Sequence, residues 1–178
     1  IQINELKKIK SVFNKSFTKA IDTILNCKGK VIFAGVGKSG LVARKISATF
    51  SSVGIPSFFC DPAQALHGDM GQIEKKDILI IFSYSGNTKE LTNMLKYANR
   101  YSIKIIGVAS KPDSILLKAS DVKLVLPKVK EADVTGIVPT TSTSITLLLG
   151  DCMATTLMHQ KKFSREKFKV FHPGGNIG

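Results

Sequence analysis

The sequence predicts an α/β protein: a three-layer α/β/α sandwich around a five-stranded, mostly parallel, doubly wound sheet. Five short apolar runs alternate with segments whose apolar residues recur at three- and four-residue steps, as in buried strands separated by amphipathic helices. Two of the runs are followed by loops rich in glycine and hydroxyl residues. Strands joined through helices favour a parallel sheet covered on both faces, with right-handed crossovers. A length of 178 residues and an apolar content of 43% suit one compact domain.

The N-terminal segment is predicted to be one amphipathic helix. Residues 1–29 would form this packing helix, which lies on the domain or on a partner, and residues 30–178 would form the domain itself. Gly29 is expected to end the helix. Its apolar face consists of Ile3, Leu6, Ile9, Phe13, Phe17, Ile21, Ile24 and Leu25.

After residue 29, strands and helices are expected to alternate. The predicted strands are residues 30–34, 56–60, 77–82, 103–109 and 122–126. The predicted helices are residues 41–52, 89–100, 113–119 and 145–159. Residues 61–71 are expected to form a loop without regular structure, whereas the hydroxyl-rich residues 140–144 suit the N-terminus of the last helix.

The net charge of +13 raises the question of a nucleic-acid partner, which we do not expect. Only three of the 26 basic residues are arginines (Arg44, Arg100 and Arg165), and arginine is the side chain that reads bases and grips phosphates in a bidentate manner. The lysines are spread over the whole chain. Such a surface is mainly a solvated one that attracts small anionic metabolites.

Neither a membrane partner nor export is expected. The longest apolar run, 78–82, is far shorter than the roughly 20 residues that span a bilayer. The lysine-rich N-terminal segment contains no unbroken apolar stretch before a cleavage site. The cysteines Cys27, Cys60 and Cys152 are odd in number and isolated, which favours neither a disulfide framework nor a thiolate metal site. We therefore expect a cytoplasmic protein.

The first glycine-containing loop, residues 35–40, follows a predicted strand and matches the GxGxxG pattern of dinucleotide-binding folds. Asp61 lies about 20 residues further on, as that fingerprint requires. The pattern is short, however, and Lys38 and Ser39 place a cation and a hydroxyl where only close backbone approach is needed. A Walker A loop fails because it would need glycine where Ile32 stands. A nucleotide-binding oxidoreductase remains an alternative.

The second loop, residues 83–88, ends a predicted strand and opens a predicted helix. Free N–H groups, the helix dipole and the hydroxyls of Ser83, Ser85 and Thr88 would converge there on one small dianion. An ordinary N-cap turn needs only one hydroxyl, so three around a glycine indicate a phosphate site. The first loop adds Ser39 and Gly37 to these predicted phosphate-binding residues.

Six segments in a fixed order resemble the sugar isomerase (SIS) family and, within it, the arabinose-5-phosphate isomerases. The resemblance covers residues from about 30 to the end of the chain. The segments are Gly35-Val-Gly-Lys-Ser-Gly40, Ala65-Leu-His-Gly-Asp69, Ser83-Tyr-Ser-Gly86, Lys130-Glu-Ala132, Pro139-Thr-Thr-Ser-Thr143 and His172-Pro-Gly-Gly175. Members often carry a paired CBS module after the last of these segments, so the resemblance implies an isomerase domain without that module.

The resemblance implies that the chain interconverts D-ribulose 5-phosphate and D-arabinose 5-phosphate through an enediol. This reaction is the entry to the sugar acid Kdo in lipopolysaccharide or capsule biosynthesis. No cofactor and no metal ion are implied, the partner is a small sugar phosphate, and the assembly is a homotetramer with sites near subunit boundaries. The catalytic residues of the family map onto Lys38, Glu90, Glu131 and His172, and His67 matches another histidine of that site.

Each of these residues also has a plainer interpretation. Glu90 suits the first turn of a helix, where the dipole favours a carboxylate, and Lys38 suits any anion-facing loop. Glu131 follows the fifth predicted strand in an irregular segment, where a carboxylate has little structural role. We therefore interpret it as a proton-transfer group. His67 and His172 stand near glycines in loops, and histidine titrates near neutral pH, which suits reversible proton transfer.

Three other functions remain open on the sequence. A metal site formed by His67, Asp69 and His172 is disfavoured because no pair has a recognised ligand spacing. A non-catalytic sugar-phosphate sensor is possible within the family, although the 29 residues before the first strand are too few for a helix-turn-helix module. An isomerase of another sugar phosphate is the third alternative, because the choice of sugar phosphate depends on pocket shape.

Overall fold

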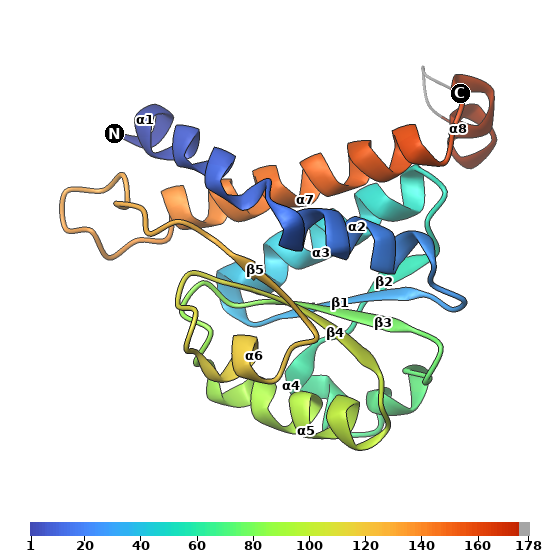
Figure 1. Cartoon of the computed structure of the whole chain (residues 1–178), viewed down its shortest axis with the longest axis horizontal. Helices are drawn as coiled ribbons and strands as arrows, with labels where there is room; N and C mark the ends of the chain where they lie inside the picture. Colours follow the sequence, from blue (N-terminus) through green and yellow to red (C-terminus); the bar gives the residue numbers. More distant parts are fainter. Residues whose placement is uncertain (175–178) are drawn as a thin grey trace.

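A computed structural model describes residues 1–174 and shows three layers, with helices on both faces of a central sheet (Figure 1). The strands are β1 (Val31–Gly35), β2 (Ser57–Phe59), β3 (Ile78–Phe82), β4 (Lys104–Ala109) and β5 (Val122–Val125). Their order is β2-β1-β3-β4-β5, and every neighbouring pair is parallel. The predicted fold class is confirmed.

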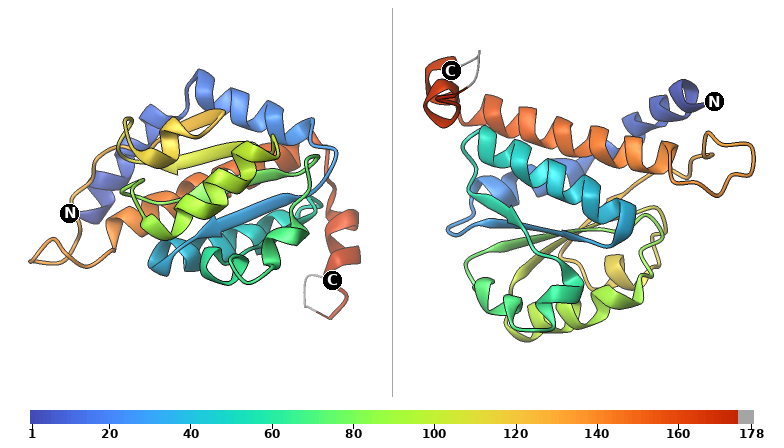
Figure 2. Two further views of the ribbon diagram at one scale, coloured as in Figure 1. Left: turned by 90° about the horizontal axis from the view of Figure 1, so that it is seen from below. Right: turned by 180° about the vertical axis from the view of Figure 1, so that it is seen from behind.

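The helices divide between the two faces (Figures 1 and 2). One face is covered by α2 (Lys15–Leu25), α3 (Gly37–Ser52) and α7 (Thr141–Gln160). The other face is covered by α4 (Pro62–Ala65), α5 (Thr92–Arg100) and α6 (Ile115–Lys118). Because successive strand residues point to opposite faces, each central strand must be apolar at every position, and this is why β1 and β3 are unbroken apolar runs.

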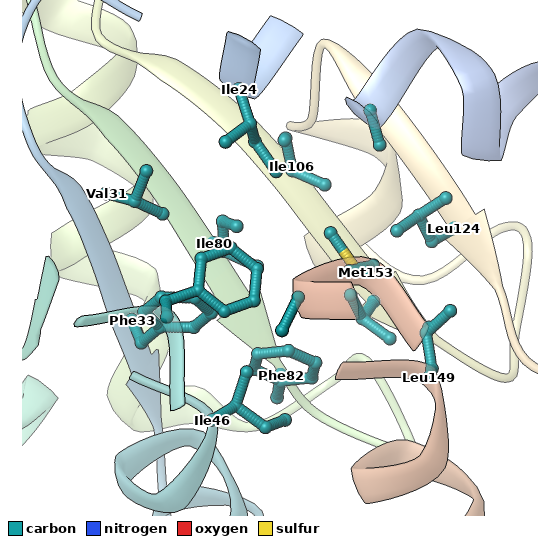
Figure 3. Close-up of a cluster of buried hydrophobic side chains, with 14 of the residues drawn as sticks. Ile24, Val31, Phe33, Ile46, Ile80, Phe82, Ile106, Leu124, Leu149 and Met153 are labelled. Atoms are coloured by element: carbon teal, nitrogen blue, oxygen red, sulfur yellow. The ribbon is translucent and has the colours of Figure 1, made fainter. Parts of the chain in front are cut away.

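The larger core lies between the sheet and the pair α3 and α7 (Figure 3). Phe33 and Phe82 of the sheet face Ile46 of α3 and Leu149 of α7, and all four side chains are almost fully buried. Gly150 lets the two helices approach closely, since a side chain there would collide with Ile46. This packing fixes the N-termini of both helices at the same edge of the sheet.

The N-terminal segment is not one continuous helix, so that part of the prediction was wrong. It consists of α1 (Gln2–Leu6), the 3-10 helix η1 (Lys7–Val12) and α2. Asn14 caps α2, because its side chain accepts a hydrogen bond from the Ser16 N–H at 2.8 Å and donates one to the Ser11 carbonyl at 3.0 Å. The regular apolar spacing indicates the buried face, but the side chain of Asn14 decides where the helix begins.

Other boundaries also differ from the predicted ones. Residues 61–71 include α4 and part of the 3-10 helix η2 (Asp69–Gln72). The 3-10 helix η3 (Lys89–Leu91) precedes α5, and α8 (Arg165–Phe171) was not predicted. Asp61 accepts a hydrogen bond from the Ala63 N–H and so caps α4, which gives it a local structural role.

None of the helices in residues 1–174 has both the length and the apolar character that crossing a bilayer requires.

Asp77 is a buried charge that joins the starts of two central strands. The residue is 1% exposed, and its side chain accepts hydrogen bonds from the N–H groups of Lys30 and Glu74, both at 2.8 Å. The Lys30 ammonium lies 3.3 Å from the carboxylate. Burial raises the pKa of Asp77, but the hydrogen bonds from Lys30 and Glu74 outweigh it, so the pKa lies below its ordinary value.

Replacing Asp77 with alanine should lower the free energy of unfolding by about 1.5–3 kcal/mol, because two N–H groups lose a charged acceptor. Chemical denaturation at neutral pH measures this change. The matched control is Asp113→Ala, since Asp113 is exposed, and it should leave stability nearly unchanged. A group whose folded-state pKa is lowered stabilises the fold above its ordinary pKa and loses that effect as the pH falls. The difference between wild type and Asp77→Ala should therefore shrink in acid; a constant difference would contradict this role.

Candidate active site

The strand order places a topological switch point between β1 and β3, where the connections leave on opposite faces of the sheet. Ligands in such folds bind outside the carboxyl ends of the strands at this point. A cavity of about 320 Å³ lies there, and we call it the switch-point pocket. It is lined by Val36, Lys38, Ser39, Val42, Ser83, Tyr84, Ser85, Thr88, Glu131, Pro139, Ser142, Thr143 and Thr146.

The loop after β3 is held in one shape by its own side chains. Gly86 has a φ of +69°, and a side chain there would collide with Ser114, so glycine is required. The Gly86 N–H donates to the Ser83 hydroxyl oxygen at 3.0 Å, and the hydroxyls of Ser83 and Thr88 lie 2.8 Å apart. The Asn87 side chain accepts a hydrogen bond from the Ile115 N–H at 3.0 Å. The loop is therefore preorganised.

The predicted phosphate-binding hydroxyls differ in how free they are. Ser83 is 4% exposed and already bonded within the loop, so it mainly shapes the site. Ser85 is exposed, whereas Ser39 and Thr88 are half-buried. All four hydroxyl residues line the pocket. Gly37 does not line it but begins α3 with a φ of +58°.

Two long helices begin at this pocket. Lys38 and Ser39 lie in the first turn of α3, and Ser142, Thr143 and Thr146 lie in the first turns of α7. Helix N-termini present free N–H groups and a partial positive charge, so together they favour an anion. The hydroxyl-rich pattern of residues 140–144 indicates a helix N-terminus but not its place in the pocket, because nothing in the local sequence shows that α7 meets α3.

Glu131 has a structural role that the sequence did not suggest. Its Oε2 accepts hydrogen bonds from the Thr140 N–H at 2.9 Å, the Thr140 hydroxyl at 3.1 Å and the Ser142 N–H at 3.1 Å. The carboxylate thus caps α7, and the expectation that it has little structural role was wrong. Burial raises its pKa, but the hydrogen bonds from Ser142 and Thr140 outweigh burial and leave the pKa below its ordinary value. The group is ionised at neutral pH.

The structure places the other predicted residues differently. Lys38 lines the pocket. Glu90 lies in η3, just beyond the pocket residue Thr88, and is exposed. His67 is exposed after α4 and does not line the pocket.

His172 is separated from the pocket by the length of α7. That helix has 20 residues and so spans roughly 30 Å, and α8 lies beyond its C-terminus (Figures 1 and 2). The pocket is lined by residues at the N-terminus of α7. His172 follows α8, where its Nδ1 lies 2.8 Å from the Phe168 carbonyl oxygen and its ring stacks on the Phe168 ring. Gly175, the last residue of the quoted motif, lies outside the described residues. Within one chain, Lys38 and Glu131 line the same pocket, whereas His172 lies beyond the opposite end of α7.

Within residues 1–174, no three histidine, cysteine, aspartate or glutamate side chains are grouped closely enough to hold a metal ion. The alternative set of His67, Asp69 and His172 is therefore not assembled within one chain.

Relatives of known sequence share most of this chain. Arabinose 5-phosphate isomerase KdsD of Escherichia coli K12 is 40% identical over 173 residues, which make up 97% of this chain and 53% of that protein. The protein RP505 of Rickettsia prowazekii is 46% identical over 162 residues, 91% of this chain and 50% of its own length. The chain spans about half the length of these curated relatives.

The fold is equally similar to solved structures. The structure of the E. coli CFT073 protein c3406 in complex with arabinose 5-phosphate has a TM-score of 0.89 and 39% identity, over 96% of this chain and 92% of that one. The SIS domain model matches residues 24–156, well over half of the sequence. The chain therefore belongs to the SIS domain family.

Proposed function

We propose that this chain is the isomerase domain of an enzyme that interconverts D-ribulose 5-phosphate and D-arabinose 5-phosphate. The observation that carries the proposal is the switch-point pocket, which combines an anion cradle with an ionised carboxylate, Glu131. The similarity to KdsD and to the c3406 structure with its bound arabinose 5-phosphate supports the choice of sugar. We further propose that the reaction serves Kdo and lipopolysaccharide synthesis in the cytoplasm.

In this proposal the phosphate binds between the two loops. The hydroxyls of Ser39, Ser85 and Thr88 and the N-termini of α3 and α7 donate to its oxygens, while Lys38 balances its charge. A volume of about 320 Å³ admits a small sugar phosphate. Binding the phosphate at a fixed point places C1 and C2 of the sugar toward the remaining wall of the pocket.

The reaction then moves one proton between the carbons C1 and C2 and one between their oxygens. One group removes the proton from C1 of the ketose and returns it to C2 of the enediol. A second group protonates the C2 oxygen and takes the proton from the C1 hydroxyl, so that atoms and charge balance. Glu131 is the carboxylate within the pocket and takes the first role. Lys38 stabilises the negative charge of the enediolate.

Among the described residues, no histidine lines the pocket of one chain. We propose that His172 of another copy takes the second role within a homotetramer. Exposed apolar side chains lie at both ends of α7, as an interface between copies would require. They are Ile1, Ile3, Val134, Ile137 and Val138 near the pocket, and Val170 and Phe171 beside His172. His67 and Glu90, both exposed, would complete the site from the same or another copy.

Incubation with ribulose 5-phosphate should yield arabinose 5-phosphate rather than ribose 5-phosphate, resolved by chromatography.

Glu131→Gln should lower kcat by about 10²- to 10⁴-fold, because the proton acceptor is lost. Its amide oxygen still accepts hydrogen bonds from α7, so stability should stay close to wild type. Glu131→Ala should in addition lower the free energy of unfolding by about 0.5–2 kcal/mol through loss of the cap. Wild-type turnover by Glu131→Gln would exclude the proton-transfer role of Glu131. Binding of the pentose phosphate by the wild type without any turnover would favour a sugar-phosphate sensor.

Ser85→Ala should act on binding instead of chemistry. Losing one hydroxyl that donates to a charged phosphate should raise KM about tenfold while kcat changes little. Steady-state kinetics measure both constants, and Ser11→Ala, an exposed serine of η1, is the matched control. An unchanged KM would mean that Ser85 does not contact the phosphate.

Co-expression of Glu131→Gln with His172→Ala tests whether His172 acts in another copy. If the two residues of one site come from different copies, about one quarter of the sites in randomly mixed oligomers carry both, so activity should return to about that fraction. If they come from the same copy, every mixed site retains one defect. Activity no higher than that of the separate variants would therefore contradict the shared site.

A further inference from the structure

Residues 127–132 carry Glu131 but belong to no helix or strand. Backbone groups outside regular structure must find partners elsewhere, because an unpaired polar group costs free energy when water is excluded. The partners of this segment therefore show what determines the position of Glu131. They come from the loop of residues 83–88, which we call the phosphate loop, from α1 and from the start of α7.

Tyr84 of the phosphate loop holds the beginning of the segment. Its phenol oxygen accepts a hydrogen bond from the Val129 N–H at 2.9 Å and donates one to the Pro127 carbonyl at 3.1 Å. Burial is the main reason that the pKa of Tyr84 lies above its ordinary value. The phenol therefore stays protonated and can donate its hydrogen bond to the Pro127 carbonyl. The Tyr84 carbonyl accepts hydrogen bonds from the N–H and the hydroxyl of Ser110, each at 2.8 Å. Both ends of this residue are fixed.

Glu5 of α1 holds the middle of the segment. Its carboxylate accepts a hydrogen bond from the Lys130 N–H at 2.9 Å, and the Lys8 ammonium lies 2.7 Å from the same oxygen. The Glu5 side chain is only 14% exposed. The Ala132 N–H donates to the Thr140 hydroxyl at 2.8 Å and so holds the far end. Glu131 thus lies between anchored neighbours.

Tyr84 differs from the other anchors because it lies inside the phosphate loop, between Ser83 and Ser85, and lines the same pocket. It therefore joins the group that fixes the phosphate to the segment that carries the carboxylate. A misplacement of about 1 Å between reacting groups lowers rates by up to roughly 100-fold. We propose that Tyr84 is a positioning residue, whose phenol group sets the distance between the phosphate loop and the carboxylate of Glu131.

The proposal rests on the proposed function for the chemical role of Glu131 and for the phosphate bound by residues 83–88. The simpler view is that Tyr84 fills space, since its ring packs against the larger core. Tyr84→Phe separates the two, because phenylalanine keeps the ring and removes only the hydroxyl. Tyr97→Phe is the matched control: the Tyr97 hydroxyl also bonds one backbone carbonyl, that of Ile73 at 3.4 Å, but its ring packs against the other core cluster.

Tyr84→Phe should lower kcat roughly 10- to 100-fold while KM for ribulose 5-phosphate changes less than about threefold. Tyr97→Phe should leave both constants near wild type. Amide hydrogen exchange at Val129 and Lys130 should become faster in Tyr84→Phe and not in Tyr97→Phe, because the Val129 N–H has lost its acceptor. Unchanged kcat in Tyr84→Phe, or unchanged exchange at Val129, would overturn the proposal.

A double-mutant cycle identifies the residue through which Tyr84 acts. In a Glu131→Gln background the further substitution Tyr84→Phe should cost less than about threefold, because the carboxylate to be positioned is gone. The full loss in that background would assign Tyr84 some other role and overturn the proposal. If the wild type isomerised no pentose phosphate, the proposed function would fail by that result alone, and the exchange at Val129 would still decide whether the Tyr84 phenol holds the segment.

Discussion

The parallel pairing of β1 with β3 is the constraint on which the site depends. Its register sets Gly35 beside Phe82, so the next residues, Val36 and Ser83, leave the sheet at the same level and both line the pocket. The chain after β1 forms α3 on one face, and the chain after β3 forms α5 on the other. The two connections separate and leave an opening between them. The pocket therefore follows from strand order before any side chain is considered.

In the proposed mechanism Glu131 has both a structural and a chemical role. The hydrogen bonds that cap α7 also lower the pKa of the carboxyl group, which makes it a weaker base but keeps it ionised and correctly oriented. A weak base suffices if the proton that it removes is made more acidic, and in the proposed mechanism Lys38 does this by stabilising the enediolate. The cost in basicity is thus offset by preorganisation.

The sequence predicts what local pattern determines. Strands buried on both faces leave unbroken apolar runs, so the five strands were predicted correctly. The loop of residues 83–88 carries a local signature in Ser83, Gly86 and Thr88, and phosphate binding there stays a prediction. The break at Asn14 was missed because one side-chain hydrogen bond overrides a regular apolar spacing. The cap formed by Glu131 was missed because Thr140 is nine residues away in an irregular segment. Such contacts are tertiary, and no periodicity reveals them.

The distribution of the predicted catalytic residues has a physical consequence in the proposed mechanism. The groups that would bind the phosphate, two helix N-termini and several hydroxyls, belong to one chain and meet in the switch-point pocket. Of the candidates for proton transfer, that pocket contains Glu131, while His172 lies beyond the far end of α7. Affinity for the sugar phosphate then depends on the fold of one subunit, whereas turnover depends on assembly. Dilution or an interface substitution should separate the two, because binding requires only the preorganised cradle and catalysis requires two groups brought together.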